Sequence, residues 1–211
     1  CKDAWTLNPD HKQEDVQKNT LEVNEAVRLA NKYPEIVKIL AVGNEAMVHW
    51  ATTYFVEPKV ILKWVNYLQH LKSSNKLDKD IWITSSDNFA SWGGGDKVYH
   101  KKELNELIRA VDYISVHTYP FHDTYYNPGF WTGVKVEAHT SNDDRIKKAI
   151  LRSSDYAINQ FESVKKYVQS LGITKPIHVG ETGWATISSD YYGQNGTRAA
   201  DEYKQFLYYN N

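Results

Sequence analysis

The sequence has 211 residues, of which 24% are charged, and its formal net charge is −1. This length allows one domain with a hydrophobic core, and the balanced charge excludes a large basic field for binding nucleic acid. One cysteine, Cys1, excludes an internal disulfide and a cysteine-based metal site, and no apolar run is long enough to span a membrane. Aromatic residues reach 13%, with 15 Tyr and 7 Trp, an excess that either packs a core or stacks on ligands.

The first half of the chain alternates helix and strand patterns. Apolar residues at spacings of three and four predict a helix over residues 10–32, and Pro34 ends it. An almost continuous apolar strand over residues 35–45 follows, as expected for a strand buried on both faces of a parallel sheet. A second helix is predicted over residues 58–74, with proline in its first turn, and a second strand over residues 80–87.

The second half repeats this alternation. An aromatic and glycine-rich loop over residues 88–100 leads to a predicted helix over 102–110 and a strand over 111–119. A long helix is then predicted over residues 143–171, a strand over 177–181 and a last helix over 197–209. Gly172 follows the long helix as its stop signal. Strands that alternate with helices predict a parallel sheet with crossover helices. The pattern alone leaves open half of an eight-stranded barrel and a small doubly wound sheet.

Two of the predicted strands end in a glutamate. Glu45 ends the first strand and Glu181 ends the last, so on a parallel sheet both side chains point into the same mouth. Two carboxylates across a cleft are the minimal set for glycoside hydrolysis, one as proton donor and the other as nucleophile or base. Strand-end glutamates can also be ion-pair partners or helix caps. The matched pair, with an amide and aromatic residues beside it, favours the catalytic interpretation.

Polar and aromatic residues accompany the two glutamates. The amide of Asn44 can hold the sugar hydroxyl next to the reacting carbon. The phenol of Tyr119 can hydrogen-bond a nucleophilic carboxylate and keep it ionised, or it can be a core tyrosine. Four tryptophans on loops after strands can stack on sugar rings or pack those loops, and they are Trp50, Trp92, Trp131 and Trp184. Trp184 is the one expected in the site, because it lies three residues after Glu181.

Other chemistries find little support in the sequence. His117, His122 and Asp123 fit no standard metal-ligand spacing, and histidines that line a sheet are the simpler interpretation. The three glycines at residues 93–95 lack the features of a phosphate-binding loop. No Gly-x-Ser-x-Gly motif occurs, which argues against a serine hydrolase. We therefore expect no metal and no cofactor.

Three stretches resemble the signatures of a known family. Residues 42–45 (Val-Gly-Asn-Glu), 116–121 (Val-His-Thr-Tyr-Pro-Phe) and 179–184 (Val-Gly-Glu-Thr-Gly-Trp) resemble those of glycoside hydrolase family 17, which contains β-1,3-glucanases. The resemblance covers nearly the whole chain and implies a retaining (β/α)8 TIM barrel. This chain would cover roughly its strands four to seven.

The resemblance also implies residue roles. Glu45 would be the general acid/base, Glu181 the nucleophile and Tyr119 a residue at the end of barrel strand six. The residues expected to contact the substrate are Asn44, Tyr119, Phe121, Trp92, Trp131 and Trp184. Retaining enzymes hold their two carboxyl groups about 5–5.5 Å apart, and we expect that separation here. His117 and Ala185 depart from the family pattern, which has Asn and Pro at these positions in many members.

Strands one to three and strand eight of the implied barrel are missing from these residues. We therefore expect one catalytic domain over residues 1–211, incomplete at both ends. The resemblance implies a β-glucan polysaccharide or oligosaccharide as partner, a secreted, periplasmic or outer-surface location, and a monomer when complete. It implies no nucleic-acid partner and no membrane insertion.

Three functions stay open for such a chain. The first is endo-acting hydrolysis of laminarin-type β-1,3-glucans. The second is transglycosylation by the same residues, with a sugar instead of water as the acceptor. The third is binding of glucan without catalysis.

Overall fold

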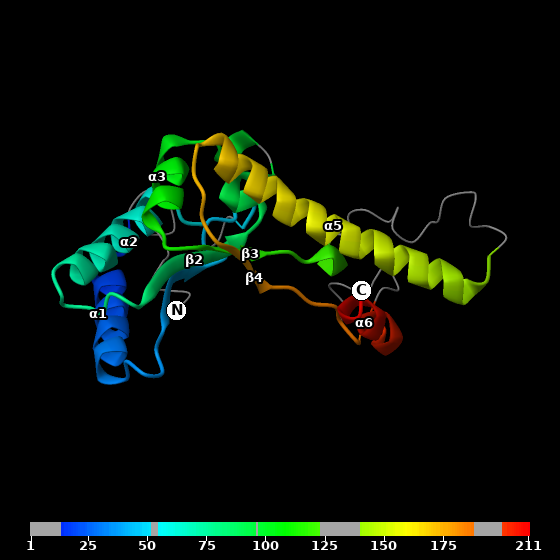
Figure 1. Cartoon of the computed structure of the whole chain (residues 1–211), viewed down its shortest axis with the longest axis horizontal. Helices are drawn as coiled ribbons and strands as arrows, with labels where there is room; N and C mark the ends of the chain where they lie inside the picture. Colours follow the sequence, from blue (N-terminus) through cyan, green and yellow to red (C-terminus); the bar gives the residue numbers. More distant parts are fainter. Residues whose placement is uncertain (1–13, 52–54, 96, 123–139, 188–199) are drawn as a thin grey trace. The chain divides into compact units, whose positions relative to one another are not determined.

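The computed structural model describes residues 14–51, 55–95, 97–122, 140–187 and 200–211 (Figure 1). The chain divides into two compact units. The first comprises Cys1–His117 with Glu162–Gly180, and the second comprises Thr118–Phe161 with Glu181–Asn211. The expectation of one catalytic domain over residues 1–211 stays a prediction.

The first unit is built on a four-stranded sheet with the strand order β1-β2-β3-β4. The strands are β1 (Ile39–Asn44), β2 (Trp82–Asn88), β3 (Ile114–His117) and β4 (Ile177–Glu181), whose last residue belongs to the second unit. Strand β2 pairs in parallel with both β1 and β3. The amide of Ile114 donates to the carbonyl of Pro176 at the start of β4. Further along, the amide of Thr118 donates to the carbonyl of Glu181, so β4 runs parallel to β3 as well. The predicted parallel sheet is therefore confirmed.

Helices precede and connect the strands. They are α1 (Val16–Lys32) before β1, α2 (Pro58–Ser73) before β2, α3 (Lys102–Ala110) before β3 and α5 (Asn142–Ser170) before β4. In Figure 1, α2 and α3 lie side by side. Helix α1 begins at Val16 because the side chain of Asp15 caps it, accepting a hydrogen bond of 3.1 Å from the amide of Lys18. None of the helices in the described ranges has the length and apolar character needed to cross a bilayer.

The core of the first unit forms where these helices pack on the sheet. Many of its fully buried side chains come from α2, α3 and the strands, among them Ile61, Ile83, Leu104, Leu107 and Ile114. Burial of one such side chain stabilises the folded state by about 1.5–3 kcal/mol. The helices therefore hold the strands, and with them the strand ends, in a defined arrangement.

The expected (β/α)8 TIM barrel is wrong for this chain, which forms an open sheet instead. In the described residues, β1 and β4 are the outer strands of that sheet and are not paired with each other. Both edges leave apolar side chains in solvent, since Ile39 of β1 and Val179 of β4 are each 49% exposed. An eight-stranded barrel closes only when strand number, tilt and register match. The βα pattern predicts the pairing of neighbouring strands, whereas closure depends on the complete set of strands.

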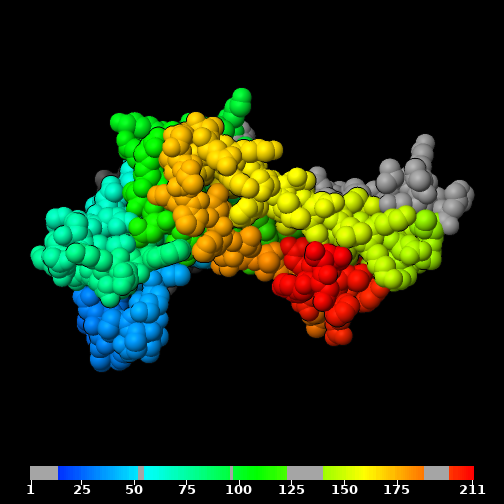
Figure 2. Space-filling model, viewed as in Figure 1, coloured from blue at the N-terminus to red at the C-terminus, as the bar shows by residue number. Residues whose placement is uncertain are grey.

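The second unit contains a smaller apolar cluster and the last helix, α6 (Glu202–Tyr209). Its buried members are Phe121, Ile150 and Trp184. Figure 2 shows α6, in red, against the first half of α5. The phenol of Tyr203 on α6 donates a hydrogen bond of 2.8 Å to Asp143 of α5. The predicted final helix is thus confirmed from Glu202 to Tyr209, whereas its described residues before Glu202 are not helical.

Candidate active site

Glu45 follows the last residue of β1 in an uncommon backbone conformation. Its φ is +47°, and that of Gly43 is +81°. The pairing of β1 with β2 is irregular between Ala41 and Asn44, so the backbone changes direction just before the carboxylate. A left-handed backbone costs a residue with a side chain about 1–2 kcal/mol. Such strain persists where the surroundings hold it, and it is often found at functional sites.

The carboxylate of Glu45 contacts a buried histidine. Its Oε1 lies 3.0 Å from Nδ1 of His117, whose side chain is fully buried, while the Glu45 side chain keeps 34% of its surface exposed. The other ring nitrogen, Nε2, lies 2.6 Å from Oγ of Ser86. That hydroxyl lies 2.8 Å from Oγ of Ser115. A continuous row of hydrogen-bonding groups therefore connects Glu45 with side chains of β2 and β3.

Asp87 of β2 anchors the loop that follows Glu45. The carboxylate is fully buried and accepts hydrogen bonds of 2.8 Å from the amides of Met47 and Asn88. Burial raises the pKa of Asp87 to about 6, and the hydrogen bonds from these amides offset only part of the effect. The backbone of Glu45 is held as well, because its amide donates to the carbonyl of Ser86 at 2.9 Å.

Glu181 has its own partner in the second unit. The phenol of Tyr119 donates a hydrogen bond of 3.0 Å to Oε2 of Glu181. The backbone of the two segments is also joined, because the amide of Thr118 donates to the carbonyl of Glu181 at 3.0 Å. Of the two alternatives that the sequence left open for Tyr119, the structure shows the hydrogen bond to this carboxylate. A hydrogen bond from a phenol limits the rotation of the carboxyl group that accepts it.

Three aromatic residues expected to contact the substrate are buried. Trp92 has no exposed surface, and its Nε1 donates a hydrogen bond of 2.9 Å to the carbonyl of Ser115. Trp184 is 3% exposed and Phe121 is 4% exposed, and their rings pack edge to face at 5.4 Å. A sugar can stack only on an open ring face. In this structure these rings therefore support the site through packing, and Trp92 belongs to the core of the first unit.

The remaining expected contacts differ in exposure. Asn44 is exposed at the end of β1, beside Glu45, where its amide is open to a ligand. Trp131 lies outside the described residues. Trp50, on the loop after β1, is 56% exposed, and its ring packs at 5.2 Å against that of His49. The phenol of Tyr99 lies 2.6 Å from Nδ1 of His49, which holds this pair in place. Trp50 thus offers an open indole near the end of β1.

His117 is the site residue whose contact the sequence interpretation missed. The alternation of strand residues identified it as a histidine that lines the sheet, and it does lie in β3. Its hydrogen bond to Glu45 requires β1 and β3 to lie on either side of β2. The local pattern of apolar and polar residues does not predict this order of strands. The sequence feature that could have indicated a polar row is the spacing of Ser115 and His117, because residues two apart on one strand share a face of the sheet.

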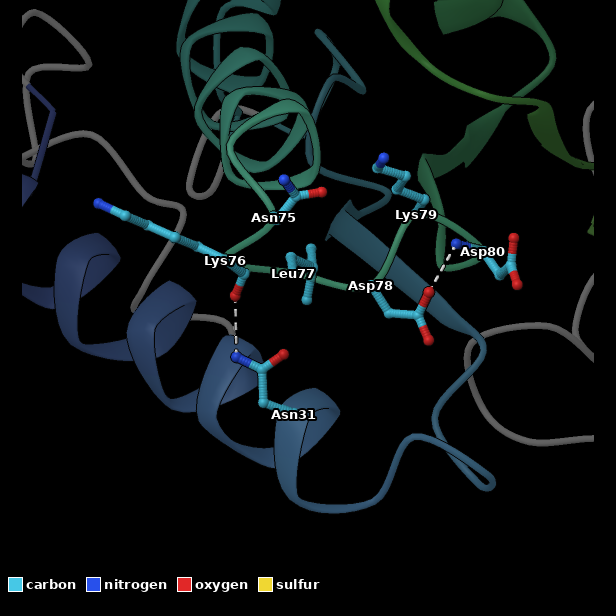
Figure 3. Close-up of a pocket in the computed structure, with 7 residues that line it drawn as sticks. All are labelled: Asn31, Asn75, Lys76, Leu77, Asp78, Lys79 and Asp80. Atoms are coloured by element: carbon cyan, nitrogen blue, oxygen red, sulfur yellow. Dashed lines mark hydrogen bonds between the residues drawn. The ribbon is translucent and has the colours of Figure 1, made fainter.

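A surface hollow of about 620 Å³ lies at the other end of β2 (Figure 3). Its lining residues are Asn31, Asn75, Lys76, Leu77, Asp78, Lys79 and Asp80. Asn31 donates to the carbonyl of Lys76 at 3.0 Å, and the amide of Asp80 donates to Asp78 at 3.0 Å. The residues that line the hollow come before Trp82, the first residue of β2, so the hollow lies at the amino end of this strand. Parallel sheets bind ligands beyond the carboxyl ends of their strands. It therefore carries no part of the candidate site.

The fold and the site together define a parallel α/β protein with carboxylates at the carboxyl ends of its strands. The chain is similar to the crystal structure of an endo-laminarinase from Formosa Hel1_33_131, with a TM-score of 0.91. The two sequences are 58% identical, and the match covers 100% of this chain. This chain spans 53% of the length of that protein. Comparisons with family models and with curated proteins found no match.

Proposed function

We propose that this chain carries the catalytic carboxylates of an endo-acting β-1,3-glucan hydrolase of the laminarinase type. The observation that carries the proposal is the 58% identity, along the whole chain, to an endo-laminarinase of nearly the same backbone. The two glutamates at strand ends, each with a hydrogen-bonding partner, support it. Membership of glycoside hydrolase family 17 and secretion from the cell are part of this proposal.

The proposed reaction proceeds with retention of configuration in two steps. Glu181, held by Tyr119, attacks the anomeric carbon, while Glu45 protonates the departing glycosidic oxygen. A covalent glycosyl-enzyme with Glu181 results, and the reducing-end part of the glucan leaves. Glu45, now ionised, takes a proton from water, which attacks the same carbon and releases Glu181. In this proposal the exposed amide of Asn44 binds a hydroxyl of the reacting sugar.

Hydrolysis of laminarin, followed by proton NMR of the newly released ends, tests the proposal. We expect the β-anomer to appear first, and oligosaccharides of several lengths to form early, because cleavage is internal and retaining. Glu181→Ala should abolish turnover, and Glu106→Ala, at an exposed position of α3, should not. Laminarin binding without release of reducing ends would contradict the proposal and indicate a glucan-binding protein. Early products longer than an oligosaccharide substrate would indicate transglycosylation.

For Glu45, azide provides a specific test. Azide can replace the water activated by the general base, so Glu45→Ala supplied with azide and an activated aryl glucoside should form a β-glycosyl azide. The azide adduct of Glu181→Ala should instead have the α configuration, because azide then replaces the nucleophile. A β-azide from both variants, or from neither, would contradict the assigned roles.

A further inference from the structure

We propose that His117 is a positioning residue that directs the catalytic proton to one oxygen of Glu45. The inference rests on the proposed function, in which Glu45 is the general acid/base. It goes further by assigning a separate task to each oxygen of that carboxyl group. His117 binds Oε1, which leaves Oε2 to carry the proton to the glycosidic oxygen.

The hydrogen-bond chemistry of the pair determines this division. An ionised carboxylate only accepts hydrogen bonds, so the 3.0 Å contact between Nδ1 and Oε1 needs a proton on Nδ1. In a neutral ring Nε2 is then an acceptor, and the hydroxyl of Ser86 at 2.6 Å can donate to it. Ser115 at 2.8 Å can donate to Ser86 in turn. All donors in the row therefore point toward Glu45.

The same arrangement serves both protonation states of Glu45. When Glu45 is a neutral acid, its Oε1 still accepts from Nδ1, and the proton occupies the oxygen that lacks this donor. After Glu45 has given up this proton, the donor at Oε1 stabilises the new charge. His117 keeps its own proton throughout, so it holds the carboxyl group without taking part in the transfer. Its full burial agrees with a residue that acts through Glu45.

The backbone provides a second reason for a dedicated positioning contact. Glu45 has a left-handed φ of +47°, and 34% of its side chain is exposed. An exposed glutamate side chain samples several rotamers, and proton transfer requires one of them. The bond to a buried ring, fixed from its other side by Ser86, selects a single orientation at the end of a strained turn.

Two amide substitutions test separately the two hydrogen bonds of the His117 imidazole, one to Glu45 and one to Ser86. The amide nitrogen of His117→Asn can occupy the position of Nδ1 and keep the bond to Glu45. That of His117→Gln reaches the position of Nε2, so this variant keeps a partner for Ser86 and loses the donor to Glu45. The informative substrates are laminarioligosaccharides, whose leaving group needs a proton, and dinitrophenyl β-laminaribioside, whose leaving group does not.

We expect His117→Gln to lower kcat/KM for laminarioligosaccharides by about 10–100-fold, a part of the 10²–10⁴-fold typical of general acid catalysis. For the dinitrophenyl substrate kcat/KM should change by less than about threefold, because no proton is needed to expel this leaving group. His117→Asn should restore most of the lost activity. In a Glu45→Ala background, His117→Gln should have no further effect. Equal losses on both substrates, or failure of Asn to restore activity, would overturn the inference.

A spectroscopic measurement keeps the inference testable if a variant fails to fold. Nitrogen-15 NMR of the wild-type protein should show His117 with its proton on Nδ1, and Glu45→Ala should shift that resonance. A proton on Nε2 alone in the wild-type protein would refute the inference, whatever the activity. Wild-type protein that cleaves neither substrate would instead refute the proposed function, and with it the role inferred for His117.

Discussion

The phenol of Tyr119 lies 3.0 Å from Oε2 of Glu181 and donates a hydrogen bond to it. The two residues are 62 positions apart, and the backbone bond between Thr118 and Glu181 brings their segments together. This contact holds the carboxyl group of the proposed nucleophile in one orientation.

Tyr119→Phe removes one hydrogen bond from Glu181 and leaves the ring. A hydrogen bond to a charged group is worth about 1.5–3 kcal/mol, so kcat on laminarin should fall by about 10–100-fold. Tyr203→Phe is the matched control, because its phenol also donates to a carboxylate in the second unit, that of Asp143. Steady-state kinetics of both variants check the prediction. Equal losses would mean that the effect reflects stability and not the position of Tyr119.

Glu45→Gly should be more stable than Glu45→Ala, against the usual order of these residues. At a φ of +47° glycine avoids the steric cost of the side chain, so the difference should be about 1 kcal/mol in favour of glycine. Urea unfolding of both variants measures it. Glu106, in the interior of helix α3, provides a control in which alanine should be favoured by a similar amount. If the alanine variant were the more stable one at both positions, the strain described at Glu45 would be absent in solution.

Gly180→Ala should be destabilising, and Ser115→Ala should partly compensate for it. A Cβ at Gly180 would lie 2.1 Å from Oγ of Ser115, whereas Cβ of Ser115 lies at an ordinary 3.5 Å. We expect Gly180→Ala to cost about 1–3 kcal/mol, as overpacking does. The loss in the double variant should be clearly smaller than the sum of the two single losses. Additive losses in thermal unfolding would contradict the close approach of β3 and β4.

Asp87 should make the stability of the protein depend on pH. Its pKa is about 6 when folded and near 3.8 when unfolded, so between these values the native state holds a proton that the unfolded chain has lost. Stability should therefore fall as pH rises through this window, by about 3 kcal/mol in total if the shift is complete.

Comparison with Asp87→Asn isolates this contribution, because asparagine does not titrate. The wild-type protein should exceed the variant in free energy of unfolding by more at pH 4.5 than at pH 7.5. Urea unfolding at both pH values measures the difference, with Asp80→Asn, at an exposed aspartate before β2, as the control. A wild-type advantage that is the same at both pH values would show that Asp87 is not held in the buried state described.

The alternation of apolar residues predicted the order of helices and strands and the parallel sheet correctly. The bounds of α3 and β4 agree with the sequence to the residue, because capping, turn signals and apolar runs act over a few neighbouring positions. Both glutamates lie at strand ends, as the strand pattern required, and Tyr119 contacts Glu181, which was one of the two alternatives open for it. Local chemistry was sufficient for these features.

Other features depended on contacts between residues distant in the sequence. The βα pattern has the same form in an open sheet and in a closed barrel, so the open sheet appeared only in the structure. The burial of Trp92 depends on a bond to Ser115, and the row from Glu45 through His117 to Ser86 depends on the order of three strands. Residues that are neighbours along the chain indicate helix or strand propensity and the periodicity of apolar positions. Which strands become neighbours, and which side chains then meet across them, follows from packing of the whole fold.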